Sequence, residues 1–131
     1  MRKNVIIPAL AVVAVLAAIG IYYLMMPKAP AGFIILKDGL ALDDDVCAAK
    51  GISDQVTVYH STDCGACKAT VPVLKEIESA SGKRFEFIEI TANRDRMMQL
   101  GMMPEFIPTV IINCKVYVGY RTKDQFLNLL R

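Results

Sequence analysis

The chain lacks tryptophan and has a single histidine, His60, among its 131 residues. It also lacks any charged side chain over the 22 residues from Val5 to Met26. All 13 acidic residues and 13 of the 15 basic residues lie beyond that stretch, so the rest of the chain is nearly neutral. Because no basic patch stands out, nucleic acid is not an expected partner.

The uncharged stretch is long enough to cross a lipid bilayer. A helix over residues 5–26 would rise roughly 33 Å, which matches the hydrocarbon core. Tyr22 and Tyr23 lie near one end, where aromatic rings favour the membrane interface. We therefore expect residues 1–26 to form a transmembrane signal-anchor helix. The alternative is a cleaved signal peptide, but its apolar region normally spans only about 7–15 residues.

The flanking charges predict the orientation of this anchor. Arg2 and Lys3 precede the span, and Lys28 is the nearest basic residue after it. Lys37 also follows the span and reduces the excess of positive charge on the N-terminal side. Positive charge favours the cytoplasmic side, so the N-terminus is expected inside. We therefore expect a single-pass protein of the plasma membrane, with its domain on the outer, extracytoplasmic face.

Residues 27–53 are expected to form a linker and an N-terminal extension. The apolar run 33–36 predicts an extra strand or an irregular cover. The acidic run 43–45 predicts the N-cap and first turn of a short helix, which Gly51 would end.

Residues 54–131 alternate between strand-like and helix-like patterns. Their order, β-α-β-α-β-β-α, predicts an α/β domain with a mixed four-stranded sheet and helices on both faces. The expected strands are 55–60, 84–90, 109–112 and 116–118, and the expected helices are 68–80, 91–101 and 122–130.

Two cysteines, Cys64 and Cys67, fall at the junction of the first strand and the first helix. The helix N-terminus favours the thiolate of Cys64, and Cys67 lies one turn deeper, within reach of a disulfide. A static disulfide or half of a zinc site are the alternatives, but no second Cys-x-x-Cys supplies further ligands. Haem attachment is disfavoured because Lys68 stands where a histidine is required. No metal is therefore expected.

With these elements in place, residues 54–131 resemble the thioredoxin-like superfamily, on its thioredoxin and glutaredoxin side. Pro72 follows Cys67 by five residues, as in thioredoxins. Ile107, Pro108 and Thr109 before the third strand look like the family's cis-proline loop, and Gly119 follows the fourth strand. The implied fold is a thioredoxin-like three-layer sandwich.

The resemblance implies that Cys64 is the nucleophile and Cys67 the resolving cysteine of a thiol–disulfide oxidoreductase. It implies no cofactor beyond this redox-active pair. The partners would be cysteine-containing protein substrates and a membrane or soluble electron carrier. The implied substrate-binding residues are Gly65, Ala66, Ile107, Pro108 and Thr109.

The sequence departs from thioredoxins around the cysteines. Asp63 replaces the usual tryptophan, and Val58 replaces a buried acid. Asp63 opposes ionisation of Cys64, and no imidazole lies inside the motif. We therefore expect the Cys64–Cys67 pair to be a weak oxidant or a reductant. His60 could tune the thiol or pass protons, or it could be a packing residue.

Cys47 and Cys114 are expected at the end of the sheet away from Cys64, and we predict a structural disulfide between them. Two free thiols are the alternative.

These patterns predict a membrane-anchored oxidoreductase that exchanges disulfides with exported proteins, as a reductant. The alternatives are a dedicated reductant of apocytochrome cysteines and a non-catalytic thioredoxin-like binding module.

Overall fold

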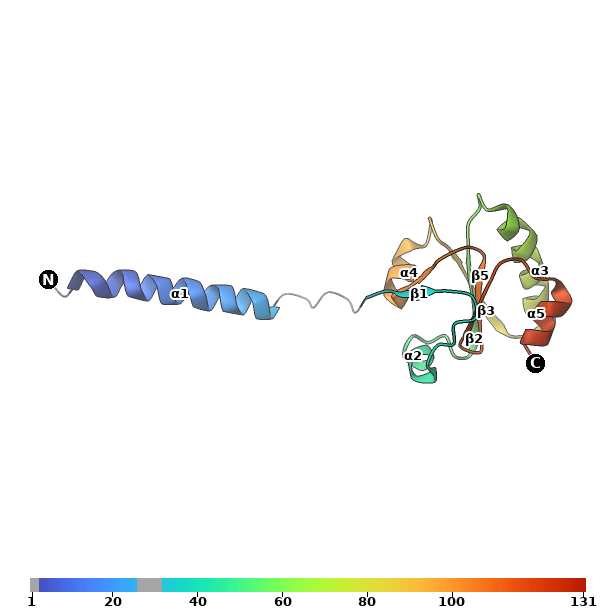
Figure 1. The fold of residues 1–131 in the computed structure, drawn as a ribbon, viewed down its shortest axis with the longest axis horizontal. Coiled ribbons are helices and arrows are strands. Elements are labelled where there is room, and N and C mark those ends of the chain that lie inside the picture. The colour runs from blue at the N-terminus through green and yellow to red at the C-terminus, as the bar shows by residue number, and fades with distance from the viewer. Residues whose placement is uncertain (1–2, 26–31) are drawn as a thin grey trace. The chain divides into compact units, whose positions relative to one another are not determined.

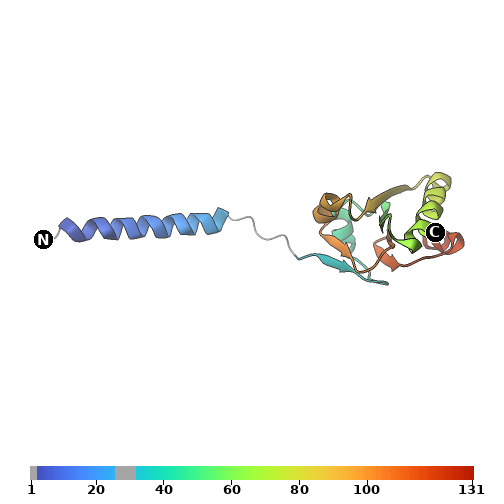
Figure 2. The ribbon, with the colours of Figure 1, turned by 90° about the horizontal axis from the view of Figure 1, so that it is seen from above.

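The computed structural model describes residues 3–25 and 32–131, without the side chains of residues 3–10. Helix α1 (Lys3–Met25) belongs to a unit of its own, and residues 32–131 form a second, compact unit (Figures 1 and 2). Among the residues described, no helix has both the length and the apolar character needed to cross a membrane. The transmembrane helix expected over residues 1–26 is therefore not found there. Residues 1, 2 and 26 of that range, and residues 27–31 of the expected linker, lie outside the described residues.

A mixed four-stranded sheet forms the centre of the compact unit, as predicted. Its strands are β2 (Gln55–His60), β3 (Arg84–Glu89), β5 (Thr109–Ile112) and β6 (Lys115–Val118). Their order is β3-β2-β5-β6, with β2 and β3 parallel and the remaining neighbours antiparallel. The middle of β2 is buried on both faces, which explains its uninterrupted run of β-branched and aromatic residues.

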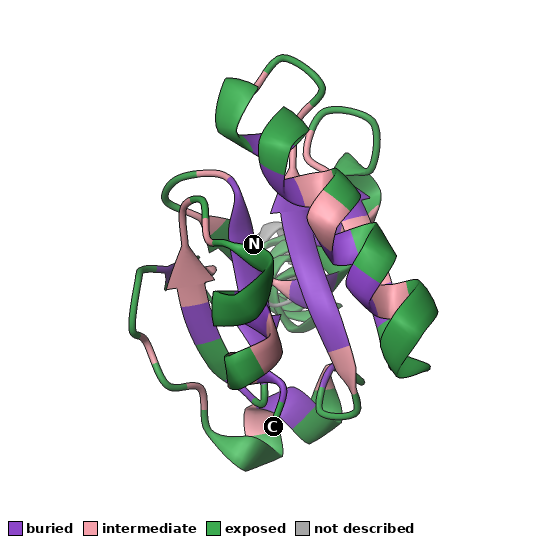
Figure 3. Cartoon of the chain, turned by 90° about the vertical axis from the view of Figure 1, so that its right-hand side faces the viewer, coloured by how far each residue is buried: buried purple, intermediate pink, exposed green. Residues whose placement is uncertain are grey.

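Helices cover both faces of this sheet (Figures 1 and 3). On one face, α3 (Gly65–Ser81) and α5 (Lys123–Leu129) bury Leu74, Ile77 and Phe126 against alternate residues of β2 and β5. On the other face lie α2 (Asp44–Ala49) and α4 (Arg94–Leu100). The three-layer sandwich expected from the sequence is therefore present.

The N-cap residues of two helices can be compared with those expected from the sequence. Thr122 caps α5 through a reciprocal pair of hydrogen bonds with Gln125, as its position predicts. Asp43 takes the N-cap position of α2 and Asp44 and Asp45 lie in its first turn, as predicted, although the Asp43 side chain makes no capping hydrogen bond.

A small parallel sheet lies beside the main one. Strand β1 (Ile34–Leu36) pairs with β4 (Met102–Pro104), a segment that lies outside the strands and helices expected from the sequence. The backbone N–H of Glu105 continues the contact by donating to the carbonyl of Leu36 over 3.1 Å. The N-terminal extension therefore holds the segment that leads directly to Pro108.

The turn between β5 and β6 consists of Asn113 and Cys114, with φ angles of 50° and 60°. Two positive φ angles are typical of a type I′ hairpin, in which the second residue is usually glycine. Cys114 forms a disulfide with Cys47 of α2, with the two Cα atoms 6.1 Å apart. Both cysteines are buried, and the bridge joins segments separated by 67 residues.

This arrangement predicts two separable effects on stability. Replacing both Cys47 and Cys114 by alanine should lower the free energy of unfolding by about 4 kcal/mol, because the unfolded chain regains loop entropy. The C47A/C114G variant should recover about 1 kcal/mol of this loss, because glycine adopts a positive φ without a Cβ clash. Urea unfolding of both variants provides the comparison. If both variants have the same free energy of unfolding, the positive φ at position 114 does not destabilise a residue that has a Cβ atom.

Candidate active site

Cys64 takes the N-cap position of α3, immediately after the turn that follows β2. Its backbone is extended, with φ −93° and ψ 117°, and the N–H of Cys67 donates to its Sγ over 3.1 Å. The turn is held by the N–H of Cys64, which donates to the carbonyl of Ser61 over 3.3 Å. The sulfur therefore lies where unpaired amides and the helix dipole favour negative charge.

Cys64 and Cys67 form a disulfide, with their Cα atoms 5.1 Å apart. The two cysteines differ in exposure: Cys64 is half-buried, whereas Cys67 is only 1% exposed. An incoming sulfur can therefore reach Cys64 but not Cys67. This asymmetry suits a pair in which the first cysteine attacks and the second closes the internal bond.

A second loop faces this pair from the start of β5. The Ile107–Pro108 peptide bond is cis, and the carbonyl oxygen of Ile107 lies 3.8 Å from the Sγ of Cys64. The carbonyls on either side are engaged. That of Phe106 accepts from the Oγ1 of Thr109 over 2.5 Å, and that of Pro108 accepts from the N–H of Gly119 over 2.8 Å.

The structure brings the site residues expected from the sequence together at one end of the sheet. Gly65 and Ala66 are exposed in the first turn of α3, whereas Pro108 and Thr109 are buried beneath the loop and Ile107 is half-buried. The register explains this proximity, because Tyr59 near the end of β2 pairs with Thr109 at the start of β5.

Apolar side chains extend the loop on its outer side. Phe106 is 66% exposed and Met103 is 38% exposed, which leaves both accessible to a partner. Met102, which precedes Met103 in β4, is instead fully buried in the core.

The electrostatics near the cysteines are dominated by a few groups. Burial lowers the pKa of His60, an effect that Lys75 reinforces and Glu89 opposes. Hydrogen bonds from Thr91 and the N–H of Ala92 hold the pKa of Glu89 below its usual value. Val58, fully buried two residues before His60, supplies no titratable group.

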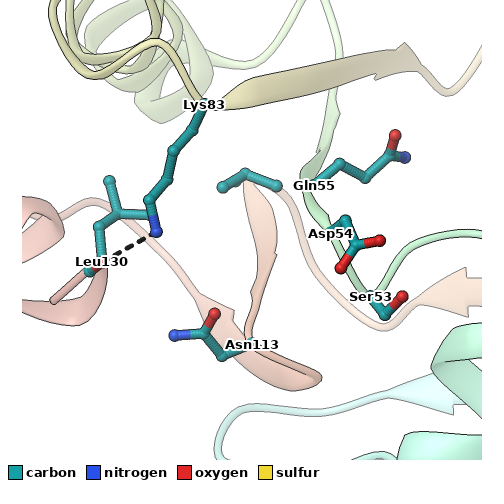
Figure 4. A pocket seen from close by; sticks show the side chains of 7 residues that line it. Ser53, Asp54, Gln55, Lys83, Asn113 and Leu130 are labelled. Carbon is teal, nitrogen blue, oxygen red and sulfur yellow. Dashed lines mark hydrogen bonds between the residues drawn. The ribbon is translucent and has the colours of Figure 1, made fainter.

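A separate pocket of about 270 Å³ lies at the opposite end of β2 (Figure 4). Ser53, Asp54 and Asn113 line it, and Lys83 on its edge donates to the carbonyl of Leu130 over 3.0 Å. It contains no cysteine, so it plays no part in sulfur chemistry at Cys64.

No protein-family model matches the chain. The thioredoxins of Listeria monocytogenes and Listeria innocua are each 29% identical to it over 77 residues, which covers 53% of this chain and 73% of theirs. The fold is thioredoxin-like.

Two solved structures are similar to it at low identity. The reduced thioredoxin pre-protein of Schistosoma mansoni gives a TM-score of 0.47 at 20% identity, covering 76% of this chain and 96% of that one. The thioredoxin of Malassezia sympodialis gives 0.45 at 19% identity, covering 80% and 95%.

The unequal burial of the two cysteines predicts unequal reactivity after mild reduction. Iodoacetamide should modify Cys64 at least about tenfold faster than Cys67, because access and thiolate character set the rate. Peptide mapping by mass spectrometry over a time course gives both rates. If Cys67 is modified first, the assignment of the exposed sulfur is wrong.

Proposed function

We propose that this chain is a thiol–disulfide oxidoreductase that acts on cysteine pairs of exported proteins. The observation that carries the proposal is the half-buried Cys64, bonded to a buried Cys67 at a helix N-terminus and facing the Ile107 carbonyl beside a cis proline. The similarity to two bacterial thioredoxins supports the same general activity.

In this proposal the reduced enzyme begins with Cys64 as a thiolate. Its Sγ attacks one sulfur of a substrate disulfide, so that a mixed disulfide forms and the other substrate sulfur leaves as a thiolate. Cys67 then loses its proton and attacks the Sγ of Cys64. This step forms the Cys64–Cys67 bond and releases the second substrate thiolate. Two electrons pass from the enzyme to the substrate, and no cofactor is required.

The substrate segment would bind as an extended strand along the loop at Pro108. The Ile107 backbone lies beside Cys64, whereas the carbonyls of Phe106 and Pro108 already accept hydrogen bonds from Thr109 and Gly119. Backbone pairing with Ile107 would place a substrate cysteine near the Sγ of Cys64. Because main-chain hydrogen bonds do not depend on side chains, this pairing would accept substrates of varied sequence. The exposed ring of Phe106 offers apolar contact to varied substrates.

We assign the reducing direction to this enzyme. Asp63 precedes Cys64, and neither Gly65 nor Ala66 supplies an imidazole that would strongly stabilise the thiolate. A less stabilised thiolate makes the dithiol a better reductant, since strong oxidants owe their potential to a stable reduced form. Repeated turnover then requires a membrane or soluble electron carrier that reduces the Cys64–Cys67 bond.

The reactivity of the pair has a direct test. The C64S variant should lose insulin reduction, at least about a hundredfold, because it lacks the attacking sulfur. The C67S variant should form mixed disulfides with substrates that persist until a reductant is added. Insulin turbidity and non-reducing electrophoresis provide the two readouts. A non-catalytic binding module would keep its partner interactions in both variants and would show no exchange activity in the unaltered chain.

We also propose that the domain is held on the outer face of the plasma membrane by residues 5–26. The support is the sequence, which places 22 uncharged residues after Arg2 and Lys3. The full-length chain should remain with membranes after alkaline carbonate extraction and should leave them only in detergent. A phosphatase that is active only outside the cytoplasm should be active when fused to the C-terminus. Release by carbonate, or an inactive fusion, would contradict the proposal.

A further inference from the structure

A second cavity, of about 410 Å³, connects the end of β2 with the first turns of α3. Cys67 and His60 both line it, together with Lys68, Val71 and Pro72. The His60 side chain projects toward this helix-covered face, since its ring packs edge-on against Phe87 at a centroid distance of 6.2 Å. The only histidine of the chain therefore lines the same cavity as the buried Cys67.

The proposed reaction requires a proton acceptor at this place. Cys67 is 1% exposed, so bulk water has little access to its thiol. Its proton must nevertheless leave before the sulfur can attack Cys64, because the thiolate is the nucleophile. Val58, the buried residue of β2 nearest to His60 on the same face, cannot accept a proton.

The other charged groups around His60 are poorly suited to this role. Lys68 and Lys75 of α3 carry positive charge and are not bases in their charged form. Glu89 is the β3 partner of His60 in the parallel register, but Thr91 and the N–H of Ala92 already hold its carboxylate. A carboxylate stabilised in this way is a weak base.

We propose that His60 is the base that accepts the proton of Cys67 when the mixed disulfide is resolved, an inference that rests on the proposed oxidoreductase function. The neutral imidazole takes the proton, and the Cys67 thiolate then forms its bond to the Sγ of Cys64. The bond between Cys64 and the substrate breaks, and its electron pair leaves on the substrate sulfur. The imidazolium then returns the proton to that thiolate or to water. His60 acts only in this second step, because Cys64 attacks as a thiolate at the helix N-terminus.

The environment of His60 fits a base that works near neutral pH. Burial lowers the pKa of His60, with Lys75 acting in the same direction and Glu89 against it, so the imidazole is neutral at pH 7. Acid converts it to imidazolium, which cannot accept a proton. The resolution rate should therefore decrease as the pH falls through the pKa of His60, which lies below its ordinary value.

The test measures the two steps separately in the full-length protein. Attack by Cys64 on a disulfide-bonded peptide is followed in the C67S background, and resolution is followed by single turnover with Cys67 present. The H60N variant should slow resolution at pH 7 by about tenfold or more, the range expected for loss of a general base, and should leave attack unchanged. Raising the pH or adding free imidazole should restore resolution. T62V, which alters another residue of the same cavity, is the matched control and should resolve at the normal rate.

A measurement on the unaltered protein covers the case in which H60N folds poorly. Because the chain has one histidine, NMR gives the pKa of His60 without ambiguity. That pKa should coincide with the kinetic pKa of resolution. Normal resolution in H60N, slow resolution that neither pH nor imidazole restores, or two different pKa values would each overturn the role of His60. If the unaltered protein forms no mixed disulfide, the proposed function itself fails.

Discussion

The antiparallel pairing of β2 with β5 is the constraint on which the candidate active site depends. It pairs Tyr59 with Thr109, so the loop after one strand and the loop before the other meet at the same end of the sheet. Cys64 and the Ile107–Pro108 bond are 43 residues apart in sequence, and only this register brings the sulfur within 3.8 Å of the Ile107 carbonyl. A shift by one residue would exchange the side chains that β2 and β5 place in the two cores on either side of the sheet, so the packing of those cores fixes the site geometry.

The N-terminal extension supports this geometry from outside the main sheet. Its strand β1 pairs with β4, and Leu36 accepts a hydrogen bond from Glu105 just before the loop at Pro108. A disulfide links the same extension to the far end of the sheet, where Cys47 of α2 is bonded to Cys114 of the β5–β6 turn. The two disulfides therefore have different surroundings: one is buried in the core, and the other includes a half-buried sulfur at a helix start.

The sequence predicted the structure best at positions where a residue type favours one local conformation or one contact. The β-branched residues of 55–60 predicted β2, Thr122 predicted the start of α5, and the spacing of Cys64 from Cys67 predicted sulfurs within bonding reach. Strand β4 was missed because its three residues carry no period, and their pairing depends on a partner almost 70 residues away. No local pattern shows that Asp43 leaves its capping bond unmade.

The central claim is that Cys64 and Cys67 cycle as a reductant while Cys47 and Cys114 remain bonded. It is tested most directly by equilibrating the protein in thiol–disulfide buffers of graded potential and mapping both bridges by mass spectrometry. The account predicts that the Cys64–Cys67 bond opens as a two-electron couple with a midpoint well below about −120 mV, the value of a strong oxidant, before the Cys47–Cys114 bond opens. A midpoint near that value, or a Cys64–Cys67 bond that stays closed while the other opens, would contradict it.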